Sequence, residues 1–132
     1  KYLRRPLLVK KRKFDLRSYM LIASSQPDVV FHREGYVRLA IQDYSLDNLE
    51  DRFAHLTNQA IQKKHENYAA EKEDTVWSMD ALNDYINEHY AEAKGVPQDW
   101  VLNDLKRQMK QIMLWCYMAA RPKTSLRHMQ VV

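Results

Sequence analysis

Hydrophobic and polar positions alternate in the first third of the chain with the two-residue period of β-strands. Residues 13–23 alternate at first and then become continuously apolar, which predicts one long strand whose far end is buried on both faces. The polar residues 24–28 predict a turn after this strand. Two shorter strands are expected at residues 29–32 and 36–41, joined by a tight turn at Glu34-Gly35. The pattern therefore predicts a three-stranded antiparallel meander.

From about residue 78 the apolar spacing changes to three and four residues, the period of an amphipathic helix. One helix is expected after Ser78 as its N-cap, with Gly95 as its stop. A second helix is expected from about residue 98 to Arg121. Its apolar side is predicted to be core, at Leu102, Leu105, Met109, Ile112, Met113, Cys116, Tyr117 and Ala120. Because strands come first and helices follow, the predicted fold class is α+β.

Composition excludes several kinds of site. The chain of 132 residues has only two glycines, which excludes a Gly-rich phosphate-binding loop within it. The single cysteine, Cys116, excludes an intramolecular disulfide and a cysteine-built zinc site, and it favours a reducing, intracellular compartment. The longest apolar run, Ile112 to Ala120, is too short to cross a bilayer. The scarcity of glycine and the abrupt start at Lys1 lead us to expect part of a larger protein.

The net charge of +4 conceals a strong segregation along the chain. Residues 1–17 carry eight Lys or Arg and one Asp, whereas residues 43–93 carry 12 acids and four bases. A basic block is often only a solvated surface, and the alternative is a site for phosphates or an acidic polypeptide. The strand period favours a site, because it places Lys13, Asp15 and Arg17 on one face with an excess of positive charge.

Two further groups carry candidate chemistry. Arg38 lies on the third predicted strand, where its simplest alternative is an exposed strand residue. The segment His55-Leu56-Thr57-Asn58 places three hydrogen-bonding side chains within four residues, and taken alone it also fits a helix cap. No histidines have the spacing of metal ligands, so no metal site is predicted in the chain.

Taken together, these groups occur in an order that resembles the tubulin–tyrosine ligase-like family. The ordered segments are Lys13-Phe14-Asp15-Leu16-Arg17-Ser18-Tyr19, then Gly35-Tyr36-Val37-Arg38, then His55-Leu56-Thr57-Asn58-Gln59. Three flanking segments also look like the family: Arg4-Arg5-Pro6-Leu7-Leu8, Ile61-Gln62-Lys63-Lys64 and Thr75-Val76-Trp77-Ser78-Met79. The resemblance is nearest to the protein polyglycylase branch. It implies a partial ligase domain over residues 1–121 and an unassigned tail over residues 122–132.

The resemblance implies an ATP-grasp-like fold and an ATP-dependent carboxylate–amine ligase. Such an enzyme adds glycine, or alternatively glutamate, to glutamate side chains of proteins such as the acidic tails of tubulin. ATP phosphorylates the acceptor carboxylate, and the amine of the free amino acid then attacks the acyl-phosphate. The family's upstream lysine and Gly-rich loop and its downstream magnesium site are not in this sequence. We therefore expect the chain alone to be inactive, with the Mg²⁺ ligands outside it.

The family's pattern also implies residue roles. Arg17 and Arg38 would bind the phosphates, the acyl-phosphate or the incoming carboxylate. This role agrees with the chemistry, because phosphoryl transfer requires cations that a rigid scaffold holds in place. Seven further residues would contact ATP. Tyr2 and Leu3 would belong to the hinge that holds the adenine, and Lys13 and Asp15 would contact the nucleotide. His55, Thr57 and Asn58 would line the ribose-phosphate side.

Tubulin or another protein with an acidic tail is the expected partner, with no nucleic acid and no membrane. The resemblance implies a cytoplasmic protein of the cytoskeleton, including cilia or flagella. Two alternatives stay open. The chain could be a non-catalytic segment that docks an acidic tail, or a nucleic-acid module that uses the basic block with Tyr2, Phe14 and Tyr19. The acidic middle segment disfavours the second alternative, because it would repel a polyanion.

Overall fold

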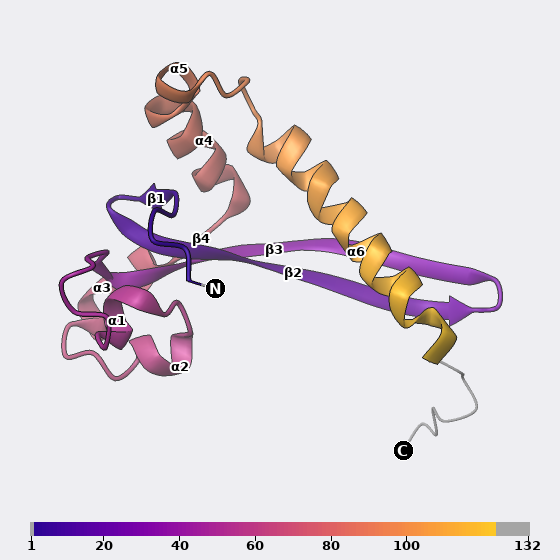
Figure 1. Ribbon diagram of the computed structural model, residues 1–132, viewed down its shortest axis with the longest axis horizontal. Helices are drawn as coiled ribbons and strands as arrows, with labels where there is room; N and C mark the ends of the chain where they lie inside the picture. Colours follow the sequence, from indigo (N-terminus) through magenta and orange to yellow (C-terminus); the bar gives the residue numbers. More distant parts are fainter. Residues whose placement is uncertain (1, 124–132) are drawn as a thin grey trace.

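The computed structural model describes residues 2–123, and its strands form one antiparallel sheet in the order β1-β2-β3-β4 (Figure 1). The strands are β1 (Leu8–Val9), β2 (Arg12–Ser25), β3 (Asp28–Asp43) and β4 (Val76–Trp77). The longer helices follow the sheet in sequence, so the predicted α+β class is confirmed. Residues 124–132 of the expected tail lie outside the described residues, and the division at residue 121 stays a prediction.

Strands β2 and β3 form one long two-stranded ribbon that extends away from the rest of the fold (Figure 1). The predicted turn at residues 24–28 is confirmed, since β2 ends at Ser25 and β3 begins at Asp28. The predicted turn at Glu34-Gly35 is wrong, because β3 continues through both residues. The expected meander of three strands is therefore a hairpin of two long strands, with short β1 and β4 at its inner end.

Gly35 lies in a β-bulge. Arg17 pairs with Tyr36 and Ser18 pairs with Glu34, so Gly35 is the extra residue on β3. A Cβ atom added at Gly35 would lie 2.2 Å from the carbonyl oxygen of Arg17. Glycine is therefore required here for the close approach of two backbones, and its presence marks a bulge instead of a turn.

The far end of the hairpin is not buried on both faces as the sequence predicted. Tyr19, Leu21 and Phe31 are 44%, 62% and 58% exposed. Only one helix lies along this part of the ribbon (Figure 1). A continuous apolar run predicts burial only when a layer covers each face, and the described residues supply one layer.

Between β3 and β4 the chain forms short helical turns beneath the inner end of the sheet (Figure 1). They are α1 (Arg52–His55), α2 (Gln59–Gln62), α3 (Tyr68–Glu71) and η1 (Lys72–Thr75). Arg12, the first residue of β2, is buried against these turns. Its guanidinium donates a hydrogen bond to the carbonyl oxygen of Asp74 at 3.3 Å. This contact ties the start of β2 to the helical segment.

Both predicted helices are confirmed. The first comprises α4 (Met79–His89) and α5 (Ala91–Lys94). Ser78 accepts a hydrogen bond from the amide of Ala81 at 3.0 Å, and Gly95 ends α5 in the left-handed region at φ 63°. The second comprises a π-helical turn, η2 (Val101–Leu105), then α6 (Lys106–Ala120) and a short 3₁₀ turn, η3 (Arg121–Lys123). Within residues 2–123 no helix is long and apolar enough to span a membrane.

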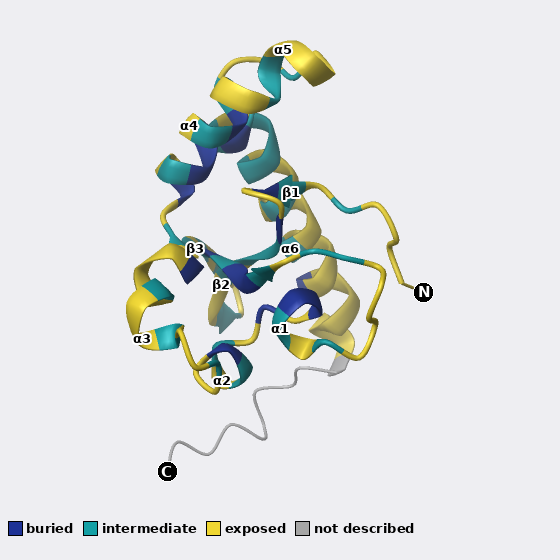
Figure 2. Cartoon of the chain, turned by 90° about the vertical axis from the view of Figure 1, so that its left-hand side faces the viewer, coloured by how far each residue is buried: buried dark blue, intermediate teal, exposed yellow. Residues whose placement is uncertain are grey.

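The main core lies where α4 and η2 pack on the inner half of the sheet. Its buried members are Val9, Val37, Leu39, Met79, Leu82, Ile86 and Val101. Figure 2 shows the buried residues gathered around α4, the inner sheet and α1. Burial of each large aliphatic side chain contributes roughly 1.5–3 kcal/mol, so this cluster holds the inner half of the hairpin firmly.

The second helix is only partly core, contrary to the prediction. Ile112 and Cys116 are exposed, whereas Tyr117 is buried and donates a hydrogen bond to the carboxylate of Asp28 at 2.6 Å. Arg121 forms an ion pair with the same carboxylate at 2.8 Å. Helix α6 lies along a ribbon of two strands, which is too narrow to cover a whole helical face (Figure 1).

We expect Gly35→Ala to lower the free energy of unfolding by about 2–3 kcal/mol, because the new methyl group would collide with the β2 backbone. Gly95→Ala is the matched control. It meets no atom within 4 Å and carries only the cost of the left-handed conformation, roughly 1 kcal/mol. Urea unfolding followed by circular dichroism measures both variants. Equal losses would contradict the close approach at Gly35.

Candidate functional site

An ion pair across the two long strands forms the centre of the candidate site. Asp15 on β2 and Arg38 on β3 lie opposite each other in the register. Arg38 donates from Nε to Oδ1 of Asp15 at 2.7 Å and from Nη2 to Oδ2 at 2.6 Å. Thr57, from the loop after α1, donates its hydroxyl hydrogen to Oδ2 at 2.7 Å. One carboxylate therefore joins two strands and a loop.

This arrangement fixes the charge of both partners. Burial alone would raise the pKa of Asp15, but hydrogen bonds from Arg38 and Thr57 and the charges of Arg38 and Arg17 lower it below 3.8. The hydrogen bond that Arg38 donates to Asp15 raises the pKa of Arg38. Both side chains are partly exposed, and Nη1 of Arg38 has no hydrogen-bond acceptor among the described residues. That nitrogen can therefore donate to a ligand.

A second set of contacts surrounds His55. Its Nε2 lies 2.9 Å from the carbonyl oxygen of Asn48, which only accepts, so Nε2 carries the hydrogen. In neutral His55, Nδ1 then accepts from the hydroxyl of Tyr2 at 2.7 Å. Lys13 donates from Nζ to the His55 carbonyl at 3.1 Å, and its ammonium lies 4.8 Å from the centre of the Tyr2 ring. These contacts bring the N-terminal segment, β2 and the loop after α1 together.

The structure thus brings six of the nine candidate residues into two adjacent networks. They are Asp15, Arg38 and Thr57 in one, and Tyr2, Lys13 and His55 in the other. Arg17 shares the strand face of Asp15, is exposed, and lies with its guanidinium 5.5 Å from the centre of the Tyr19 ring. The side chains of Leu3 and Asn58 are exposed and enter neither network.

The simpler interpretations of these residues fail. Asn58 occupies the N-cap position of α2, but its side chain makes no capping hydrogen bond, and the hydroxyl of Thr57 is directed to Asp15. Arg38 is not merely an exposed strand residue, since its guanidinium is held by two hydrogen bonds. Within residues 2–123 there is no cluster of three His, Cys, Asp or Glu side chains placed to hold a metal.

The sequence analysis named Gln62 only within the segment Ile61-Gln62-Lys63-Lys64 and gave it no role. The residue is fully buried beneath the site. Its Oε1 accepts from the amide of Ile41 on β3 at 2.8 Å, and its Nε2 donates to the carbonyl of Leu56 at 2.7 Å. Gln62 therefore fixes the loop that carries Thr57 to the sheet. Only the position of Gln62 just after His55-Leu56-Thr57-Asn58 could have hinted at this role, because glutamine is usually exposed.

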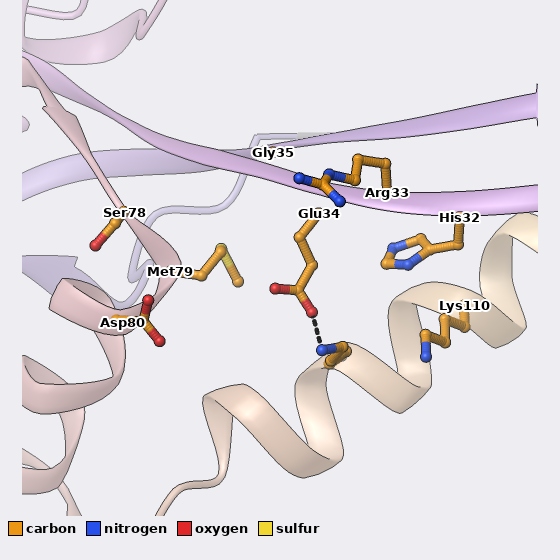
Figure 3. Close-up of a pocket in the computed structure, with 9 residues that line it drawn as sticks. His32, Arg33, Glu34, Gly35, Ser78, Met79, Asp80 and Lys110 are labelled. Atoms are coloured by element: carbon orange, nitrogen blue, oxygen red, sulfur yellow. Dashed lines mark ion pairs between the residues drawn. The ribbon is translucent and has the colours of Figure 1, made fainter.

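A cavity of about 520 Å³ lies on the other side of the hairpin, between β3, the start of α4 and α6 (Figure 3). An ion pair between Glu34 and Lys106 crosses it. Burial, together with the nearby charge of Lys110, lowers the pKa of His32, which also lines the cavity. None of the nine candidate residues lines this cavity, so it is separate from the candidate site.

We expect the stability that Asp15 contributes to depend on pH. Because its pKa is lower in the folded state than the ordinary 3.8, this contribution is complete above the unfolded value and is lost as the pH falls through the folded value. Urea unfolding of the wild type and of Asp15→Asn should therefore differ by a constant free energy near neutral pH and converge below pH 3.8. Parallel curves down to acid pH would contradict this assignment.

The chain is similar to known proteins over most of its length. The sequence matches the tubulin-tyrosine ligase family over residues 1–130. It is 48% identical over 123 residues to protein polyglycylase TTLL10 of Macaca fascicularis, which covers 93% of this chain and 20% of that protein. Inactive polyglycylase TTLL10 of Homo sapiens is also 48% identical over 123 residues, or 93% of this chain and 18% of that protein.

A more distant relative is tubulin glycylase 3B of Tetrahymena thermophila, which is 32% identical over 117 residues, or 88% of this chain and 10% of that protein. The chain therefore spans about a fifth or less of the length of these relatives. The family match, in contrast, extends over nearly the whole chain. The resemblance noted in the sequence is confirmed, and this chain belongs to the tubulin-tyrosine ligase family.

Proposed function

We propose that this chain is the central part of an ATP-dependent ligase that adds glycine to glutamate side chains of tubulin or of a similar acidic protein. The observation that carries the proposal is the Asp15 carboxylate, which holds Arg38 and Thr57 beside exposed cations. The names of the relatives, polyglycylase and tubulin glycylase, support the choice of glycine over glutamate. The proposed ligase region comprises residues 1–121 within an ATP-grasp-like fold, and the chain alone is proposed to be inactive.

The residues present fit a triphosphate and a carboxylate. ATP supplies the phosphoryl group that activates the acceptor carboxylate, and loss of phosphate then accompanies amide formation with the amino acid. Negative charge on the transferring group is stabilised by donors that are oriented before the reaction. Nη1 of Arg38 and the guanidinium of Arg17 are such donors on rigid strands. Asp15 acts as a positioning residue, because it prevents Arg38 from rotating away, and its spare lone pairs can accept from a ligand hydroxyl.

The nucleotide is proposed to lie along the second network. Lys13 keeps further N–H groups for a phosphate while His55 fixes its position. The ring of Tyr2 and the side chain of Leu3 offer exposed apolar surface for a base, next to the loop with Thr57 and Asn58. Magnesium accompanies ATP in this reaction, and the described residues offer no cluster to hold it, so we assign its ligands outside residues 2–123.

A non-catalytic docking role is the second candidate. It is favoured by one observation, that a relative named inactive is as similar to this chain as one named polyglycylase, each at 48% identity. Such a protein would bind an acidic tail without modifying it. In either case we propose a cytoplasmic protein that acts on the cytoskeleton, including cilia or flagella, without nucleic acid or membrane as its partner.

The proposal predicts that the complete protein, incubated with tubulin and Mg-ATP, produces a ladder of glycine additions in the mass spectrum. Arg38→Ala should reduce the initial rate by about 10²–10³-fold, since it removes a donor aimed at developing charge. The fold should lose only about 1 kcal/mol, because the pair is partly exposed.

Arg107→Ala is the matched control, because Arg107 is an exposed cation on α6 that pairs only with Asp104 among the described residues. It should retain the wild-type rate. Full activity of Arg38→Ala would remove Arg38 from the site. A ladder with glutamate in place of glycine would transfer the protein to the glutamylases, and no addition from a folded, ATP-binding protein would favour the docking role.

A further inference from the structure

The face of the β2–β3 hairpin that holds the candidate site extends beyond it toward the tip of the hairpin. Side chains alternate along a strand, so Asp15, Arg17, Tyr19 and Leu21 share one face of β2. Their partners on β3 share that face too. These partners are Arg38, Tyr36, Arg33 and Phe31. In Figure 3, the side chains of His32 and Glu34 point toward α6. The side chain of Arg33, which also belongs to the lining of the cavity, extends from the opposite side of the strand.

We call the outer part of this surface the open face, made of Arg17, Tyr19, Leu21, Phe31 and Arg33. All five residues are exposed. It continues directly from the pair Asp15–Arg38 toward the tip of the hairpin. Helix α6 lies along the opposite side, as its contacts with Ser18 and Glu34 show.

The charges of the hairpin are divided between its two sides. Its acids toward the tip, Asp28 and Glu34, are neutralised by Arg121 and Lys106 from the second helix. Asp15 is neutralised by Arg38. Neither Arg17 nor Arg33 forms an ion pair among residues 2–123, although the charge of Arg17 acts on Asp15. The guanidinium of Arg17 lies near the ring of Tyr19. The open face therefore combines two cations that form no ion pair with aromatic and aliphatic surface.

We propose that the open face binds an acidic segment of the protein acceptor, with carboxylates on Arg17 and Arg33 and with Tyr19, Leu21 and Phe31 against the peptide chain. This inference rests on the proposed function, because it extends the site at Arg38. Tyr19, the partner of Arg33, lies four positions beyond Asp15 on β2, which is about 13 Å at 3.3 Å per residue. An extended acceptor with its reacting glutamate at Arg38 thus brings a carboxylate about four residues away to Arg33.

Charge complementarity selects an acidic peptide as the occupant. Guanidinium groups bind carboxylates in a bidentate geometry, and exposed aromatic side chains supply contact area at little cost in conformational entropy. An apolar partner alone would leave Arg17 and Arg33 desolvated without a counter-charge, which is unfavourable.

The test measures binding of a fluorescein-labelled short polyglutamate peptide to the complete protein by anisotropy, without ATP and at low salt. Arg33→Glu should weaken binding roughly tenfold, because an attraction becomes a repulsion. Arg33→Lys should retain most of the affinity. Arg107→Glu is the matched control, since it makes the same charge change at an exposed position of α6 outside the cavity that Arg33 lines. It should bind like the wild type.

Equal losses in Arg33→Glu and Arg107→Glu, or no loss in Arg33→Glu, would overturn the open face as the binding surface, provided that thermal melting shows both variants folded. A short single-stranded RNA that binds more tightly than polyglutamate and depends on Arg33 would assign the face to nucleic acid instead. If the protein adds glycine but Arg33→Glu leaves peptide binding unchanged, this inference alone is refuted. A protein that binds through Arg33 and adds no amino acid refutes the ligase and keeps the docking surface.

Discussion

The ion pair between Asp15 and Arg38 is the interaction on which the candidate site depends. It lies on two neighbouring strands, so its geometry is set by the register of the hairpin. The same carboxylate holds Thr57 and therefore the loop after α1. Gln62 secures that loop from below through two backbone hydrogen bonds. Loss of Asp15 would release a strand cation and a loop donor together, which is why this residue matters although it has no apolar contribution to the core.

The bulge at Gly35 decides which side chains face the site. An extra residue in one strand reverses the side on which the following side chains point. Beyond Gly35, the bulge therefore turns His32 and Glu34 toward α6, where Glu34 meets Lys106, and leaves Arg33 opposite. Without the extra residue, Glu34 would lie on the open face, and Arg33 would point toward α6, which carries lysines. This one bulge thus places the acid Glu34 on the side of α6 and the cation Arg33 on the open face.

Part of the candidate site could be predicted from the sequence, and the other part could not, because it depends on contacts between distant segments. Strand periodicity put Lys13, Asp15 and Arg17 on one face, because alternation is a local property. It read Gly35 as a turn, because glycine fits a turn and a bulge equally well, and only the distance to the Arg17 carbonyl distinguishes them. The convergence of Thr57 on Asp15 spans 42 residues, and it was expected only through the order of family motifs. Gln62 stood in a family-like segment, but its structural role could not be predicted, since burial of a polar residue depends on partners that local sequence does not reveal.

Membership of the tubulin-tyrosine ligase family leaves activity as the central question, because of two relatives of equal similarity one is named polyglycylase and the other inactive polyglycylase. We propose that Asp15 works by positioning Arg38. A double-mutant cycle on the rate of glycine incorporation by the complete protein tests this claim most directly. If Asp15 acts through Arg38, the variant with both Asp15→Ala and Arg38→Ala should lose about as much activity as Arg38→Ala alone. Losses that multiply would contradict the account and give each residue an independent role.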